Sequence, residues 1–288
     1  MILVVGATGH LGGLTTRLLL ARHAEVRILG RQGAAWQSLH DAGAQVSIGD
    51  LKSPETLDAI CEGVDVVITT ANSALRSAPD TVTSVDIDGN RNLIDAARRA
   101  GVGQFIFVSA FGVTTDSPVP LFRAKALSEA HLRDSGLPYT ILAPDAFMDV
   151  WFPMVVGRPA LAGQPVTLVG EGRRKHSFIA AADVAAFATA SIGRPEAMNV
   201  HLPLGGPDAL SWRDVVASFE RVLHREIPVV TLAPGQKVPG VPDIVSALMS
   251  GLDSYDSVIP TSDAARTFGV TQTSVDDFVR GMPVQTGL

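Results

Sequence analysis

Three glycines near the start of the chain, Gly6, Gly9 and Gly12, follow the apolar residues 2–5 with the spacing G-x-x-G-x-x-G. Gly6 permits a tight turn, Gly9 lets the backbone approach a phosphate, and Gly12 lets the next helix pack closely on the strand. The N-terminus of that helix then faces the anion. The pattern predicts a dinucleotide pyrophosphate site, and the alternative is a purely structural turn. The other residues that we place at this site are Thr8, His10 and Leu11.

Apolar segments and helical segments alternate through the first half of the chain, with short connections between them. The predicted strands are residues 2–5, 25–29, 44–48, 64–68, 105–108 and 139–142. Ser53 and Pro54 are typical of the start of a helix, and Gly63 and Gly101 of helix ends. This alternation predicts an α/β fold, a Rossmann doubly wound parallel sheet with helices on both faces.

In such a sheet the ligand lies beyond the carboxyl ends of the strands, so the residues that follow each strand are the candidates for binding it. Arg31 follows the second strand, where a protein that prefers NAD usually carries an acidic residue. A guanidinium suits the 2′-phosphate of NADP, while an ordinary exposed arginine is the alternative. We therefore expect NADP(H) as the cofactor, with NAD(H) as the second choice.

The loops after the later strands supply the remaining predicted cofactor contacts. Asp50 would accept a hydrogen bond from the adenine amino group and Leu51 would cover the adenine ring, although a plain turn has the same composition. Thr70, Ala71 and Asn72 would run along the ribose, and Ser109 would lie near the nicotinamide ring. Pro144 and Phe147 would reach the nicotinamide carboxamide.

Several segments beyond the glycine turn resemble the atypical short-chain dehydrogenase/reductases, and within them the NmrA-like group. They are residues 85–93, 107–110, Lys125 with 135–142, 176–179, 183–185 and 204–207. The resemblance implies a Rossmann domain over residues 1–148, completed by about 176–202. It also implies a smaller, mostly C-terminal substrate lobe over 149–175 and 203–288, which closes over the nicotinamide end.

Members of this group with full activity usually carry a serine, a tyrosine and a lysine, with the tyrosine four positions before the lysine. Lys125 matches, but Leu121 stands at the tyrosine position and Ala110 at the serine position. The resemblance implies that Lys125 binds the nicotinamide ribose and acts as the catalytic cation. The alternative is a surface pair between Lys125 and Glu129, one helical turn later.

Without a tyrosine to donate a proton, the substrate itself must stabilise the negative charge that hydride transfer creates. Quinones, enones, extended dye-like cations and carbonyls hydrogen-bonded to a neighbouring phenol have this property. Aromatic and apolar side chains near the expected nicotinamide end fit a flat hydrophobic substrate, and core packing is the alternative. These side chains are Phe111, Phe147, Met148 and Trp151.

The sequence thus predicts an NADPH-dependent reductase of a conjugated, quinone-like or polycyclic aromatic carbonyl, in a secondary-metabolite or detoxification pathway. The alternative is a non-catalytic redox sensor that binds NADP and reports to a partner protein. A third hypothesis keeps the enzyme but uses the cofactor for dehydration, epimerisation or an oxygen-dependent step.

Composition excludes several other classes of protein. The net charge of −6 over 288 residues gives no general attraction to nucleic acid. Cys61 is the only cysteine and no H-E-x-x-H pair occurs, so we expect no disulfide and no metal site. We expect no membrane span and no signal peptide, and therefore a cytoplasmic monomer or homodimer.

Prolines accumulate after residue 151, and the alternation of strands and helices weakens. We expect strands at 166–170 and 198–202, and an alanine-rich helix over 176–192. Ser211 is the predicted cap of a helix that begins at Trp212 and runs through Leu223. Residues 238–260, rich in glycine and proline, are the expected mobile cover.

Overall fold

The computed structural model describes residues 1–74, 76 and 78–282. In this part of the chain seven strands form one sheet, in the order β3-β2-β1-β4-β5-β6-β9. The strands are β1 (Ile2–Val5), β2 (Val26–Gly30), β3 (Gln45–Ile48), β4 (Val66–Thr69), β5 (Gln104–Val108), β6 (Tyr139–Pro144) and β9 (Val200–Leu204). The strand pairs β1–β2, β1–β4, β2–β3, β4–β5 and β5–β6 are all parallel. The predicted doubly wound parallel sheet is confirmed.

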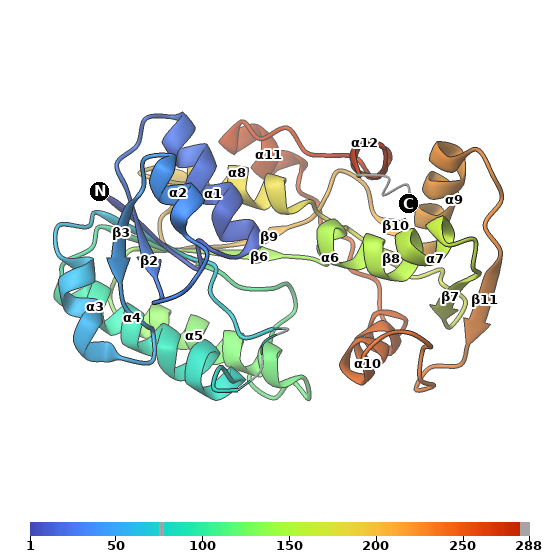
Figure 1. Ribbon diagram of the computed structural model, residues 1–288, viewed down its shortest axis with the longest axis horizontal. Helices are drawn as coiled ribbons and strands as arrows, with labels where there is room; N and C mark the ends of the chain where they lie inside the picture. The colour runs from blue at the N-terminus through green and yellow to red at the C-terminus, as the bar shows by residue number, and fades with distance from the viewer. Residues whose placement is uncertain (75, 77, 283–288) are drawn as a thin grey trace. The chain divides into compact units, whose positions relative to one another are not determined.

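Strand order reverses between β1 and β4, which is where a fold of this type opens a crevice for a ligand. Helices α1 (His10–Ala21) and α2 (Gln37–Asp41) cover one face of the sheet (Figure 1). The other face carries α3 (Pro54–Cys61), α4 (Asp88–Arg99) and α5 (Pro120–Asp134) (Figure 1). The side chains of β1, β4 and β5 that point to this second face are fully buried under α4, among them Leu3, Val67 and Phe105.

The chain divides into two compact units. The first contains Met1–Pro144, Val184–Pro203 and Arg266–Val270, and the second contains Asp145–Asp183, Leu204–Ala265 and Thr271–Leu288. The sequence predicts that the first domain ends at residue 148 and that the chain returns to it over about residues 176–202. Each unit has its own hydrophobic core.

The second unit is built from short strands and helices around an aromatic core in which Phe152 and Phe178 are fully buried. Its strands are β7 (Val166–Val169), β8 (Lys175–His176), β10 (Leu210–Ser211) and β11 (Val229–Leu232). Its helices are α6 (Met148–Phe152), η2 (Pro153–Gly157), α7 (Arg158–Leu161), α9 (Trp212–Leu223), α10 (Asp243–Leu252) and α12 (Val275–Gly281). Four further elements lie elsewhere in the chain: η1 (Val82–Ile87), α8 (Ala181–Ala190), η3 (Pro195–Ala197) and α11 (Ser262–Phe268).

The helix expected over 176–192 begins later than predicted, since α8 starts at Ala181. His176 is instead in β8, where it pairs with Leu210 of β10, and the backbone N–H of Ser177 donates to the Asp145 carboxylate at 2.9 Å. These partners come from distant segments, so the local alanine-rich pattern could not indicate them.

Two other expectations for the second half concern the helix after Ser211 and the segment 238–260. Helix α9 runs from Trp212 to Leu223, and the Ser211 side chain accepts a hydrogen bond from the backbone N–H of Asp214, which confirms the predicted cap. Residues Asp243–Leu252 of the expected mobile cover form helix α10, in which the side chains of Val245 and Met249 are buried. Over the described residues, no helix combines the length and the apolar character that crossing a membrane requires.

Candidate cofactor site

The turn between β1 and α1 leaves no room for a side chain at two of its glycines, Gly6 and Gly12. Gly6 has φ +86°, and a Cβ atom there would lie 2.6 Å from Oγ1 of Thr70. A Cβ at Gly12 would lie 2.2 Å from the carbonyl oxygen of Gly6. Bare backbone therefore faces the N-terminus of a helix of 12 residues, which is the arrangement that binds a pyrophosphate. This turn fits an NAD(P) cofactor.

A cavity of about 270 Å³ adjoins the turn, and its lining includes Thr8, Gly9 and His10. Arg17, two turns after His10 on α1, also lines it, and its Nη2 atom lies 3.3 Å from Oγ of Ser38. The cavity therefore has a cation in its wall that sequence reasoning did not single out. The spacing of Arg17 from Gly13 on one helix face was the available signal.

Arg31 does not stand alone after β2. Its Nη1 atom donates to Oδ2 of Asp80 at 2.7 Å. Lys52, which follows β3, and Arg76, which follows β4, bind the same carboxylate. The hydrogen bond from Lys52 and those from the two arginines hold the pKa of Asp80 at about 2, although burial opposes the shift. Arg31 is thus one member of a cluster that the sequence did not reveal.

Asp50 and Leu51 differ in their surroundings. Asp50 binds Lys52 through both oxygens, one to the Lys52 backbone N–H at 2.9 Å and the other to its Nζ at 3.1 Å. Leu51 is 6% exposed and packs in the core of the first unit. Its predicted contact with adenine stays a prediction, and most of its surface is already covered by protein.

Thr70, Ala71 and Asn72 run from the end of β4 past the glycine turn. The backbone N–H of Thr70 donates to the carbonyl oxygen of Val5 at 2.9 Å, which ties this segment to β1. The side chain of Asn72 donates to the Thr70 carbonyl oxygen at 3.2 Å. The three residues are therefore held beside Gly6, where the prediction puts the ribose.

Lys125 is a buried lysine on α5. Its Nζ atom donates to the carbonyl oxygen of Val108 at 2.9 Å and lies 5.4 Å from the centroid of the Phe107 ring. Burial lowers the pKa of Lys125, while the charges of Asp86 and Glu129 oppose that shift. The ammonium group therefore sits at the carboxyl end of β5, where the prediction puts the nicotinamide ribose.

Glu129 does not make the surface pair with Lys125 that was the alternative interpretation. Its side chain is 5% exposed, and Oε2 accepts a hydrogen bond from Nη2 of Arg133 at 2.7 Å. Its Oε1 lies 3.6 Å from Nε2 of His201 on β9. Burial raises the pKa of Glu129, but His201, Ser109 and Arg133 outweigh burial and lower the pKa below its usual value.

Two more polar groups near Lys125 are buried. Ser109 is 3% exposed and its hydroxyl lowers the pKa of Glu129, while Oδ1 of Asp86 has no hydrogen-bond partner within the described residues. The other oxygen of Asp86 accepts from the backbone N–H of Ser73 at 3.0 Å, and burial raises the pKa of Asp86. An unsatisfied buried polar group is uncommon and calls for an explanation, and a bound ligand would supply one.

Of the predicted substrate contacts, Phe111 belongs to the first unit, where it is half-buried and its N–H donates to the carbonyl oxygen of Pro144 at 2.8 Å. The other three belong to the second unit. Phe147 is half-buried, Met148 has no exposed surface, and Trp151 stacks edge-on against Trp212. Met148 and Trp151 are thus surrounded as core residues are, and their contact with substrate stays a prediction.

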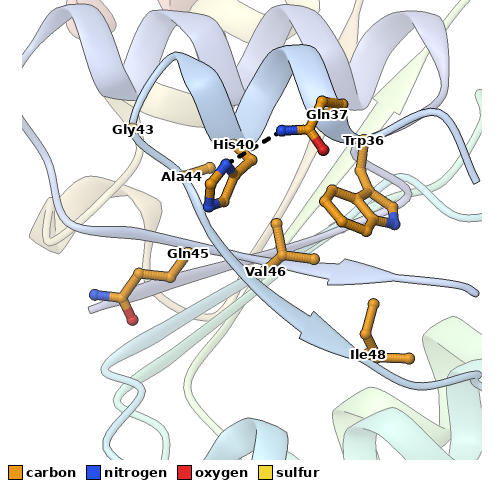
Figure 2. A pocket seen from close by; sticks show the side chains of 8 residues that line it. All are labelled: Trp36, Gln37, His40, Gly43, Ala44, Gln45, Val46 and Ile48. Atoms are coloured by element: carbon orange, nitrogen blue, oxygen red, sulfur yellow. Dashed lines mark hydrogen bonds between the residues drawn. The ribbon is translucent and has the colours of Figure 1, made fainter.

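A separate groove of about 620 Å³ lies along β3, at the outer edge of the sheet. Figure 2 shows the rings of Trp36 and His40 on one side of it and Val46 and Ile48 on the strand. Its lining is mostly apolar, and it shares no residue with the cavity at the glycine turn. We assign no ligand to it.

Comparison with known proteins gives the family. Residues 6–195 match a family described as NAD(P)H-binding. The NAD(P)H azoreductase of Xenophilus azovorans is 33% identical over 232 residues, which are 81% of this chain and 77% of that protein. The photosystem II assembly factor Ycf39 of Cyanophora paradoxa is 34% identical over 224 residues, 77% of this chain and 68% of that protein.

Among solved structures, an NADPH-dependent quinone oxidoreductase from Escherichia coli in complex with NADPH has the same fold. The TM-score is 0.81 at 22% identity, and the match covers 97% of this chain and 98% of that one. The glycine turn and the doubly wound sheet are those of an NAD(P)-binding fold, and the sequence matches are to NAD(P)H-binding proteins. The chain belongs to the NAD(P)H-binding family, in the NmrA-like group of atypical short-chain dehydrogenase/reductases.

Proposed function

We propose that this NAD(P)H-binding oxidoreductase uses NADPH to reduce a flat conjugated substrate, of the quinone, polycyclic aromatic carbonyl or azo type. The observation that carries the proposal is that the site has a buried lysine but lacks the tyrosine that would donate a proton. Lys125 lies at the carboxyl end of β5, and Leu121 occupies the position one turn earlier on α5 where a proton-donating tyrosine would stand.

The cofactor would be held by backbone and cations of the first unit. The glycine turn and the N-terminus of α1 would bind the pyrophosphate, Arg31 the 2′-phosphate, and Thr70 and Asn72 the adjoining ribose. When bound, the nicotinamide supplies a hydride. Each of these roles is a proposal that rests on the position of the residue at the carboxyl ends of β1, β2 and β4.

Lys125 contributes a positive potential that favours negative charge developing on the substrate. An ammonium group held in a low-dielectric site stabilises such charge more than water would. Its hydrogen bond to the Val108 carbonyl fixes its position, and the charges of Asp86 and Glu129 keep it from losing its proton as readily as burial alone would allow.

The substrate class follows from what Lys125 cannot do alone. A simple ketone becomes a localised alkoxide and needs a positioned acid, which contributes roughly 10² to 10⁴ in rate. A quinone, a polycyclic carbonyl or an azo dye spreads the charge over conjugated atoms and takes its protons from water. The names of the relatives, an azoreductase and a quinone oxidoreductase, support this class.

The test is turnover of NADPH by purified protein with a panel of quinones, polycyclic ketones and azo dyes, and with simple ketones as the matched negative set. We expect NADPH oxidation with the conjugated set and little with the simple ketones. Binding of NADPH without oxidation by any member of a broad panel would contradict the proposal.

The second candidate function is regulatory. The chain is 34% identical to a photosystem II assembly factor, and the tyrosine is absent here. A regulator would bind NADPH and NADP⁺ with clearly different affinities and hold a protein partner in only one of the two states. Titration with each form of the cofactor, followed by capture of partners in each state, separates this function from the reductase.

A further inference from the structure

Three positively charged side chains from three different loops meet on one carboxylate. Arg31 follows β2 and its Nη1 atom lies 2.7 Å from Oδ2 of Asp80. Arg76 follows β4 and its Nη1 atom lies 3.1 Å from the same oxygen. Lys52 follows β3 and its Nζ atom binds the other oxygen. All four residues belong to the first unit.

The carboxylate is on the inside of this cluster and the cations are on the outside. Asp80 is 8% exposed, whereas the side chains of Arg31, Arg76 and Lys52 are 40%, 36% and 25% exposed. Asp80 uses only one nitrogen of each guanidinium. A guanidinium has five N–H donors, so each arginine can bind Asp80 and still present donors toward solvent.

The charges do not cancel. All three cations bind Asp80, and Lys52 also binds Asp50. Three positive and two negative charges leave the cluster with a net charge of +1. It stands at the carboxyl ends of β2 and β3, where the adenosine half of a dinucleotide lies in this fold. A phosphate on the adenosine ribose carries about −1.5 to −2 charges near pH 7, and the cluster can attract it.

From this geometry we propose that Asp80 is an internal competitor of the cofactor's 2′-phosphate, and that it sets how strongly the protein prefers NADPH over NADH. The inference rests on the proposed binding of the 2′-phosphate by Arg31. A phosphate that binds these cations comes next to a buried carboxylate that already holds them. The two anions repel each other and share the same donors, so NADPH binds less tightly than the three cations alone would allow.

NADH carries a hydroxyl group where NADPH carries the phosphate, so it does not face this repulsion. Asp80 therefore weakens the binding of NADPH but not that of NADH. In the alternative role, Asp80 would strengthen NADPH binding by holding three mutually repelling cations in place for the phosphate. The two roles predict opposite changes when the charge is removed.

The experiment is calorimetric titration of Asp80→Asn with NADPH and with NADH. We expect the Kd for NADPH to fall by about fivefold, because one negative charge near the phosphate is gone, and the Kd for NADH to stay the same. A weaker NADPH complex, or an equal change for both cofactors, would overturn the inference. The matched control is Asp58→Asn, since Asp58 pairs with Arg99 at 2.7 Å on the exposed surface of the same unit.

A second variant, Asp80→Ser, keeps the inference testable if Asp80→Asn does not fold. It also removes the carboxylate and leaves the three cations in place, so the Kd for NADPH should fall while that for NADH stays unchanged. No change in the NADPH affinity would count against the inference. If the wild-type protein binds neither cofactor, the proposed function fails; if it binds both and neither variant shifts their ratio, only this inference fails.

Discussion

The Nζ atom of Lys125 donates a hydrogen bond of 2.9 Å to the carbonyl oxygen of Val108. This contact ties α5 to the carboxyl end of β5 and fixes a buried positive charge there. Since Leu121 lies one turn earlier on the same helix, the charge has no phenol beside it from that position. The proposed chemistry depends on this combination.

Replacing Lys125 with methionine tests the cation directly. Lys125→Met keeps the length and apolar stem of the side chain but removes the charge, so kcat with a quinone should fall on the order of 100-fold. Steady-state kinetics measures this. Lys237→Met is the control, because the exposed Lys237 pairs with Asp243 in the second unit and should leave kcat unchanged.

Adding the missing acid should change the substrate range. Leu121→Tyr puts a phenol four positions before Lys125, on the same face of α5. Turnover of simple aromatic ketones should rise on the order of tenfold, since a positioned acid can donate the proton that they need. Leu127→Tyr, at an exposed position of the same helix, should give no increase. Equal activity of the two variants toward simple ketones would show that the missing tyrosine does not restrict the substrate.

The glycine turn offers a matched pair of substitutions. A Cβ atom at Gly9 would lie 3.2 Å from the Gly6 carbonyl oxygen, and one at Gly13 would lie 3.3 Å from the Ala7 carbonyl oxygen. Gly9→Ala and Gly13→Ala should therefore change the free energy of unfolding to a similar, small extent, within about 1 kcal/mol. Only Gly9→Ala should weaken NADPH binding, on the order of tenfold, because Gly9 is the residue that a phosphate approaches. Loss of affinity in both variants, measured by fluorescence titration, would argue against this assignment.

Glu129 should stabilise the fold in a pH-dependent way. Its pKa in the folded protein is below the usual value, because His201, Ser109 and Arg133 outweigh burial. Its contribution is therefore present above the unfolded pKa of about 4.3 and is lost as the pH falls through the folded pKa. Glu129→Gln should cost about 2 kcal/mol at pH 7, and the difference from wild type should narrow below about pH 4.

Urea denaturation at several pH values measures that difference. Glu196→Gln, which breaks an exposed pair with Arg194, is the control and should have little effect at any pH. A difference between wild type and Glu129→Gln that does not change with pH would mean that the carboxylate charge has no role in stability.

Local patterns were enough to predict the sheet and the glycine turn. Strands β1, β2, β4, β5 and β6 are short, mainly apolar runs, and β3 alternates polar and apolar residues, so each is visible within a few residues of sequence. Ser211 and its helix were predicted for the same reason. The segment 176–180 was assigned wrongly because His176 takes its partners from residues 210, 252 and 257.

The charged groups around the site were the part that the sequence could not predict. Arg31, Lys52 and Asp80 meet only because three loops converge at one end of the sheet. A surface pair of Glu129 with Lys125 was the alternative interpretation, but Glu129 is buried and His201, 72 positions later in the chain, packs against it. Sequence reasoning could place each loop at the carboxyl edge, but it had no means of pairing side chains across loops.

The most direct test of the account is calorimetric titration of the folded wild-type protein with NADPH. The account predicts saturable binding of one NADPH per chain, which NADP⁺ competes for and Lys125→Met weakens. Failure of either form of the cofactor to bind well-folded protein would contradict the central claim that an NADPH-dependent site lies at the carboxyl edge of this sheet.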